Sequence, residues 1–102
     1  MDTKVDASRG KQSRLFCLGQ IVSTPGALDV LLECNQPPSE FLTRHAQGDW
    51  GDLCEEDKEA NEEALLEGLR LLSSYRTNNG TKIWIITEDN RSATTVLLPQ
   101  EY

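Results

Sequence analysis

The sequence predicts one α+β domain in which three helices pack on one face of a small antiparallel sheet. Capped, amphipathic segments occupy the chain up to about residue 69, and the strongest strand and hairpin signals follow them. The sheet is expected to be a C-terminal three-stranded meander, which an N-terminal strand could join. This domain spans residues 14–102, whereas residues 1–13 are polar, lack periodicity and are expected to be a disordered tail.

The first ordered element is expected at residues 15–22, an apolar and partly β-branched run that is typical of a strand. A helix should then begin at Thr24 and Pro25, because a threonine hydroxyl can cap and a first-turn proline loses no needed donor. Asn35, which tolerates a left-handed backbone, and the prolines after it should end this helix. Its core stripe is expected to consist of Leu28, Leu31 and Leu32.

Two further helices are predicted before the sheet. The first begins at Pro38, buries Phe41 and Leu42, and ends near Gly48. The second covers about residues 53–69, where Asp52 and Glu55 have the spacing of a capping box. Winding this helix at 100° per residue predicts a buried side made of Ala60, Ala64, Leu65 and Gly68.

The C-terminal third of the chain reads as a strand meander. Asn79-Gly80 is a strong hairpin signal, because both residues tolerate the positive φ of a type I′ turn. The flanking strands are expected at residues 71–77 and 82–87, and a third strand at residues 94–98 is stopped by Pro99. Within the central strand Trp84 has apolar neighbours on both faces, so a homodimer through the sheet is one functional alternative.

Charge and cysteine content limit the classes of function. The net charge is −7, and residues 49–67 hold nine acids and one base, Lys58. Phosphate contacts dominate nucleic-acid affinity, so this surface argues against direct nucleic-acid binding and favours a basic protein surface as partner. The three cysteines have no zinc-site spacing, and buried free thiols are expected. No metal, cofactor or membrane contact is predicted, and the expected location is cytoplasmic.

The acidic third helix is the main candidate for a partner-binding surface. Leu66 falls among its carboxylates and away from the Ala60 stripe, as an apolar anchor of an interface would. An ordinary solvated helix face is the alternative reading, since single exposed leucines are common. The predicted partner-binding residues are Glu55, Glu59, Glu62, Glu63, Leu66 and Glu67. The leading hypothesis is therefore a non-enzymatic interaction protein.

A small hydrolase or nuclease is the rival hypothesis. His45, the one histidine, could act as a general base if Asp49 orients its ring, or together with Arg91. The alternative reading of His45 is a residue near a helix C-terminus that interacts favourably with the helix dipole. No Gly-rich phosphate loop or nucleophile motif accompanies these residues.

Several segments resemble a group of short bacterial proteins that are labelled hypothetical or plasmid-related, sometimes after restriction-modification loci. The strings that carry the resemblance are STPGALDVL, RHAQGDWGDL and GTKIWIITEDNRSATTVLLPQEY. The resemblance runs from about Leu15 to Tyr102, and it carries no catalytic motif. Where the group commonly has an acid after GDWGDL, this chain has Cys54. The resemblance implies a bacterial, cytosolic protein associated with mobile elements, such as a regulator or inhibitor of a nucleic-acid-handling partner.

Overall fold

A computed structural model describes residues 14–102 and confirms the α+β class. The predicted tail, residues 1–13, lies outside the described residues. In chain order the elements are β1 (Gln20–Ser23), α2 (Pro25–Cys34), α3 (Pro38–Ala46), α4 (Glu55–Glu67), β2 (Leu71–Arg76), β3 (Lys82–Thr87), β4 (Ala93–Leu97) and the 3₁₀ turn η2 (Pro99–Glu101).

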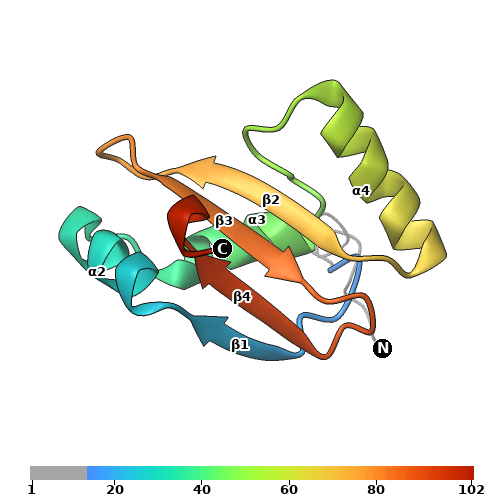
Figure 1. Cartoon of the computed structure of the whole chain (residues 1–102), viewed down its shortest axis with the longest axis horizontal. Helices are drawn as coiled ribbons and strands as arrows, with labels where there is room; N and C mark the ends of the chain where they lie inside the picture. Colours follow the sequence, from blue (N-terminus) through green and yellow to red (C-terminus); the bar gives the residue numbers. More distant parts are fainter. Residues whose placement is uncertain (1–13) are drawn as a thin grey trace, which may run out of the picture.

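The four strands form one mixed sheet in the order β1-β4-β3-β2 (Figure 1). The predicted meander is present, with β2, β3 and β4 antiparallel, whereas β1 joins β4 in parallel. The N-terminal strand begins at Gln20 and not at Leu15. The chain bends at Gly19, whose φ is +66° and where a Cβ would lie 2.4 Å from the backbone of Ser92.

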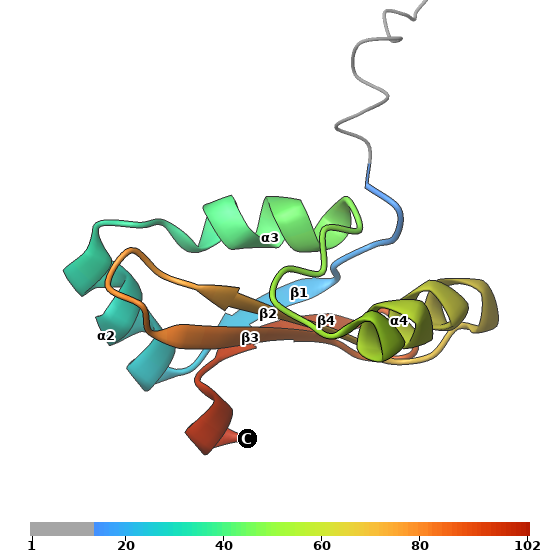
Figure 2. The ribbon, with the colours of Figure 1, turned by 90° about the horizontal axis from the view of Figure 1, so that it is seen from above.

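The three helices take different places around the sheet. Figure 2 shows α3 lying over one face, α2 at one end of the strands and α4 beside the outer edge of β2. The main core lies between α3 and the sheet, where Phe41 packs with Tyr75, Ile83, Ile85 and Val96. A smaller cluster of Trp50, Ala64 and Leu71 joins α4 to the sheet.

The opposite face of the sheet carries a row of apolar and threonine side chains. Val22, Thr95, Ile86 and Leu72 are register neighbours across all four strands. The C-terminus crosses part of this face: Tyr102 packs edge-on against Trp84 with the ring centroids 5.9 Å apart, and its hydroxyl accepts a 2.7 Å hydrogen bond from Arg70. Ile86 is consequently buried, while Val22 stays 44% exposed.

The buried side of α2 is rotated relative to the predicted stripe. Thr24 caps the helix by accepting from the Ala27 amide at 3.2 Å, and Asn35 ends it with φ of 58°, both as expected. The buried residues, however, are Ala27 and Leu31, and Leu28 and Leu32 are 42% and 77% exposed. Val30 also packs against the core, so the stripe that meets the sheet is Ala27, Val30 and Leu31.

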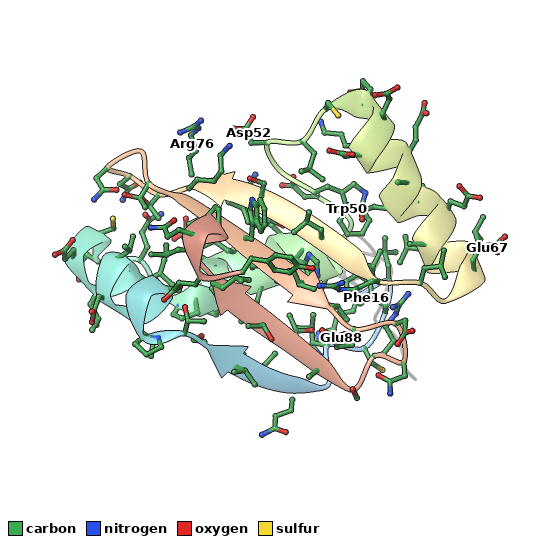
Figure 3. All side chains as sticks on the ribbon, viewed as in Figure 1. Phe16, Trp50, Asp52, Glu67, Arg76 and Glu88 are labelled. Carbon is green, nitrogen blue, oxygen red and sulfur yellow. The ribbon has the colours of Figure 1, made fainter. Side chains whose placement is uncertain are left out.

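The rotation and start of α4 also differ from the prediction. Asn61 and Ala64 are buried, whereas Ala60 is exposed. The helix begins after Cys54, which makes no side-chain cap, and the predicted capping residue Asp52 instead lies 3.3 Å from Arg76 (Figure 3). The first turn of α4 therefore depends on Glu55, Glu56 and Asp57 near the positive end of the helix dipole.

The β2–β3 hairpin forms at the predicted place with a different turn. The Gly80 amide donates to the Thr77 carbonyl at 2.9 Å, and Gly80 has φ of +85° while Asn79 is not in the left-handed region. This pattern matches a three-residue loop that ends in a left-handed glycine. Asn79 contributes its side chain instead, accepting from the hydroxyls of Thr77 and Thr81 at 2.6 and 2.8 Å.

Burial of the thiols was predicted and is not found. Cys17 and Cys54 are exposed and Cys34 is half-buried, and all three are free thiols. Within residues 14–102 no helix is both long and apolar enough to cross a membrane.

Candidate functional site

The candidate site is the outward face of α4, a helix of 13 residues that lies beside the sheet (Figure 1). Two contacts fasten its inner face. The Asn61 side chain donates to the Leu72 carbonyl at 2.7 Å and accepts from the Leu72 amide at 3.2 Å, so it pairs with the edge of β2 as a neighbouring strand would. Ala64 packs on Trp50 and Leu71. The opposite side of α4 is left to solvent.

All six predicted partner-binding residues are exposed. Leu66 is 88% exposed, and on a helical wheel it lies within about 60° of Glu59 and Glu63, opposite Asn61. Glu67 points away from the domain at the end of α4 (Figure 3). On the same wheel Glu55 and Glu62 lie within about 40° of Leu66, so four carboxylates share its face, and Glu67, about 100° away, flanks them.

Glu62 has a structural contact that the sequence pattern did not reveal. Its carboxylate accepts a 2.8 Å hydrogen bond from the indole N–H of Trp50. Trp50 is 4% exposed and lies between α4 and the sheet (Figure 3). A buried indole N–H needs a hydrogen-bond partner. Glu62 therefore helps to hold α4 against Trp50, in addition to contributing to the acidic surface.

The carboxylates of α4 have few cationic neighbours among the described residues. Lys58 lies 3.9 Å from Glu55, a long contact between side chains that are 38% and 86% exposed. The two other ion pairs within residues 14–102, Arg44–Asp49 and Arg76–Asp52, lie outside the helix. Exposed pairs of this kind contribute about 0–1 kcal/mol, so the negative field of α4 is largely uncompensated.

His45 lies in the core rather than in a cleft. Its side chain is fully buried, with Nδ1 2.6 Å from the Ser73 hydroxyl and Nε2 2.9 Å from the Thr87 hydroxyl. The ring also meets Phe16 and Trp50 edge-on. Since both ring nitrogens already have partners, no nitrogen is directed at a substrate.

The hydroxyl chain beside His45 determines its tautomer. Thr94 donates its one proton to the Leu18 carbonyl at 2.6 Å, so in the 2.7 Å contact between the two threonines Thr87 is the donor. Thr87 must then accept from Nε2–H of His45, and Ser73 donates to Nδ1. Burial, with a smaller contribution from the positive charge of Arg91, lowers the pKa of His45 to about 4. The imidazole is neutral at pH 7.

The structure does not bring His45 and Asp49 together. The Asp49 carboxylate accepts a 2.7 Å hydrogen bond from Arg44, which lowers the pKa of that carboxyl group. It also accepts from the Gly51 amide at 3.1 Å, in a turn that leads the chain away from α3. Asp49 therefore shapes a turn and does not orient the histidine ring.

Arg91, the other predicted catalytic partner, holds a loop in place. Its guanidinium donates to the carbonyls of Leu69, Glu88 and Asp89 at 2.6, 3.0 and 3.2 Å, and to that of Ala64 at 3.2 Å. The Ala64 carbonyl, in the last turn of α4, also accepts from the Gly68 and Leu69 amides, so Arg91 adds a positive charge at the negative end of the helix dipole. With His45, Asp49 and Arg91 used in this way, the arrangement offers no support for hydrolase or nuclease chemistry.

Comparison with known proteins adds no functional information, because no family model, curated protein or solved structure matches this chain. The resemblance to plasmid-related bacterial proteins stays a prediction. Within residues 14–102 no three histidine, cysteine or acidic side chains gather in a way that could hold a metal ion.

Proposed function

We propose that this chain is a non-enzymatic interaction protein whose acidic α4 face docks on a basic protein surface. The observation that carries the proposal is the exposure of Leu66 among carboxylates that the described lysines and arginines leave nearly uncompensated. An apolar side chain at the centre of a charged patch supplies the desolvated contact, while the surrounding charges steer the partner and set the orientation.

The charge density of α4 favours a nucleic-acid-handling protein as the partner. The 13 residues of α4 include seven acids and one lysine, a net charge of −6. At about 1.5 Å per residue this is one charge per roughly 3 Å of axis, close to the roughly 3.4 Å per phosphate along one DNA strand. A surface built to bind phosphates would meet a similar field on α4, so the chain could act as a regulator or inhibitor of such a partner.

Charge reversal on the outward face tests this function. The triple variant Glu59→Lys, Glu63→Lys, Glu67→Lys leaves the Trp50–Glu62 and Asn61–Leu72 contacts untouched, so its melting temperature should not fall below that of the wild type. Capture of the partner from a lysate of the natural host should fall at least about tenfold, because several close charge pairs become repulsive. An added DNA duplex should also displace the captured protein.

The matched control changes the net charge equally elsewhere. Asp29→Lys, Glu33→Lys, Asp89→Lys alters exposed acids of α2 and the β3–β4 turn. This control should capture the partner as well as the wild type does. Equal retention by both triple variants, or equal loss from both, would show that α4 is not the docking surface.

A further inference from the structure

The two edges of the sheet are treated differently by the chain. The outer edge of β2 is covered: Asn61 pairs with both backbone groups of Leu72, and Ser74 exchanges hydrogen bonds with the residues before α4. The Ser74 amide donates to the Trp50 carbonyl at 3.2 Å, and its carbonyl accepts from the Asp52 amide at 2.6 Å. Covering an edge in this way prevents another strand from pairing there.

The edge formed by β1 has no such cover among residues 14–102. Gln20 and Thr24 donate their amides to Ser92 and Val96 of the neighbouring segment, at 2.9 and 3.0 Å. Because backbone groups alternate in direction along a strand, those of Ile21 and Ser23 point to the free side. The four residues of β1 carry no charge, and three of them are exposed. Charged or proline residues that usually protect an edge are missing.

A groove runs along this free edge, between β1 and α3. Its volume is about 810 Å³. Leu18, Ile21, Leu42 and Ala46 give it an apolar floor, and Thr43 stands on the α3 side. Figure 2 shows α3 lying above the sheet on this side. A strand that paired with β1 would therefore direct alternate side chains into a preformed groove, the geometry in which backbone bonds supply affinity and the groove supplies specificity.

Charge selects the kind of strand that fits. Among the described residues that line the groove, Arg14 is the only charged one, although the whole chain has a net charge of −7. Arg14 lies before the start of β1, so an antiparallel strand would bring its C-terminal end beside this guanidinium. A carboxylate there gains a charge-assisted contact that a basic segment would not.

We propose that the groove between β1 and α3 binds an extended segment of another polypeptide. The segment adds to β1 as an antiparallel fifth strand, places apolar side chains at alternate positions against Leu18, Ile21 and Leu42, and sets a carboxylate beside Arg14. The site is separate from α4, which lies at the opposite edge of the sheet (Figure 1). A second copy of this chain fits less well, because its helix α2 begins two residues after β1 and would bring a helix, not an extended segment, to Arg14.

Peptide display on the full chain tests this inference. A phage library of random peptides with free C-termini, each about eight residues long, is panned against the wild type, and one enriched peptide is synthesised for fluorescence anisotropy. Enriched sequences should have apolar residues at alternate positions and an acid or free carboxylate at the C-terminal end. Amidation of that end, or Arg14→Gln, should weaken binding severalfold.

Two variants block the site by different routes. Ser23→Pro removes an outward N–H that pairs with nothing in the sheet, and Thr43→Trp fills the groove from α3. Either change should lower the affinity at least about tenfold. Ser23→Ala, which keeps the N–H, and Glu33→Trp, which adds the same ring on the exposed side of α2, should bind like the wild type and show the same melting temperature.

Three results would overturn the inference: no enriched peptide, binding that survives both blocking variants, or a concentration-dependent mass in light scattering that Ser23→Pro abolishes. The last result would assign the β1 edge to a second copy. The triple lysine variant of α4 should bind the peptide normally, so the proposed function and this groove can fail independently.

Discussion

His45 shows how one buried side chain joins segments that are distant in sequence. Its ring, on α3, contacts Ser73 on β2 and Thr87 on β3, and the chain of hydroxyls continues through Thr94 to the Leu18 carbonyl before β1. Such a network stabilises the fold only when every member has a partner. Protonation of the imidazole would add a second donor and a charge in the core.

The lowered pKa of His45 predicts a loss of stability in mild acid. The folded pKa of about 4 lies below the unfolded value of 6.5, so between these pH values the unfolded chain binds a proton that the folded chain does not. The stabilisation is therefore complete above about pH 6.5 and is lost as the pH falls toward 4. From pH 7 to about pH 4.5 the loss should be about 2 kcal/mol.

Urea unfolding of the wild type and of His45→Gln at both pH values measures this effect. The variant will be less stable at neutral pH, but its stability should depend less on pH by about 2 kcal/mol, because it lacks the titrating ring. Equal pH dependence in the two proteins would mean that His45 titrates normally in the folded state.

At the scale of elements, α4 is fastened at its middle while its outer face stays free. Asn61 is 5% exposed, and its side chain pairs with the amide and the carbonyl of Leu72. Without Asn61 these two groups at the edge of β2 would face α4 with no hydrogen-bond partner. This contact explains why Asn61, rather than Ala60, faces the sheet. It also leaves the carboxylates of the acidic face projecting together.

Asn61→Ala should lower the free energy of unfolding by about 1–3 kcal/mol, because the amide and carbonyl of Leu72 both lose a partner. Asn61→Asp keeps an acceptor for the amide but turns a buried carboxylate oxygen toward the Leu72 carbonyl, so it should destabilise the protein at least as much as Asn61→Ala does. Hydrogen exchange at the Leu72 amide should accelerate in Asn61→Ala, and Glu63→Ala on the outer face serves as the control. Unchanged exchange at Leu72 would show that α4 is held by Ala64 and Trp50 alone.

At the scale of the whole molecule, the acidic charge opposes compactness. The net charge is −7, and most of the excess lies on one helix with a single weak ion pair among the described residues. One carboxylate outside α4 has a stabilising role: Glu101, in the C-terminal turn, caps α2 by accepting from the Thr24 hydroxyl and the Gly26 amide. The C-terminal turn is thus held against the start of α2.

This imbalance predicts stabilisation by salt. Raising NaCl from about 0.01 M to about 1 M shortens the Debye length from roughly 30 Å to 3 Å and screens repulsion along α4. The melting temperature should rise, and the rise should be smaller in the triple lysine variant. A melting temperature that falls with salt in the wild type would mean that attractive pairs outweigh the repulsion.

The sequence by itself determined the α+β class, the helices after Thr24 and Pro38, the β2–β3–β4 meander and the acidity of α4. These features depend on local signals, namely caps, prolines, a hairpin glycine and apolar periodicity, which act within a few residues. Only the tertiary structure decided the rest. The parallel pairing of β1 with β4, the rotation of α4 through Asn61, the burial of His45 and the separation of His45 from Asp49 all depend on contacts between residues far apart in the chain. No local pattern encodes which edge of a sheet a helix covers, because that choice depends on how all the apolar surfaces are buried together.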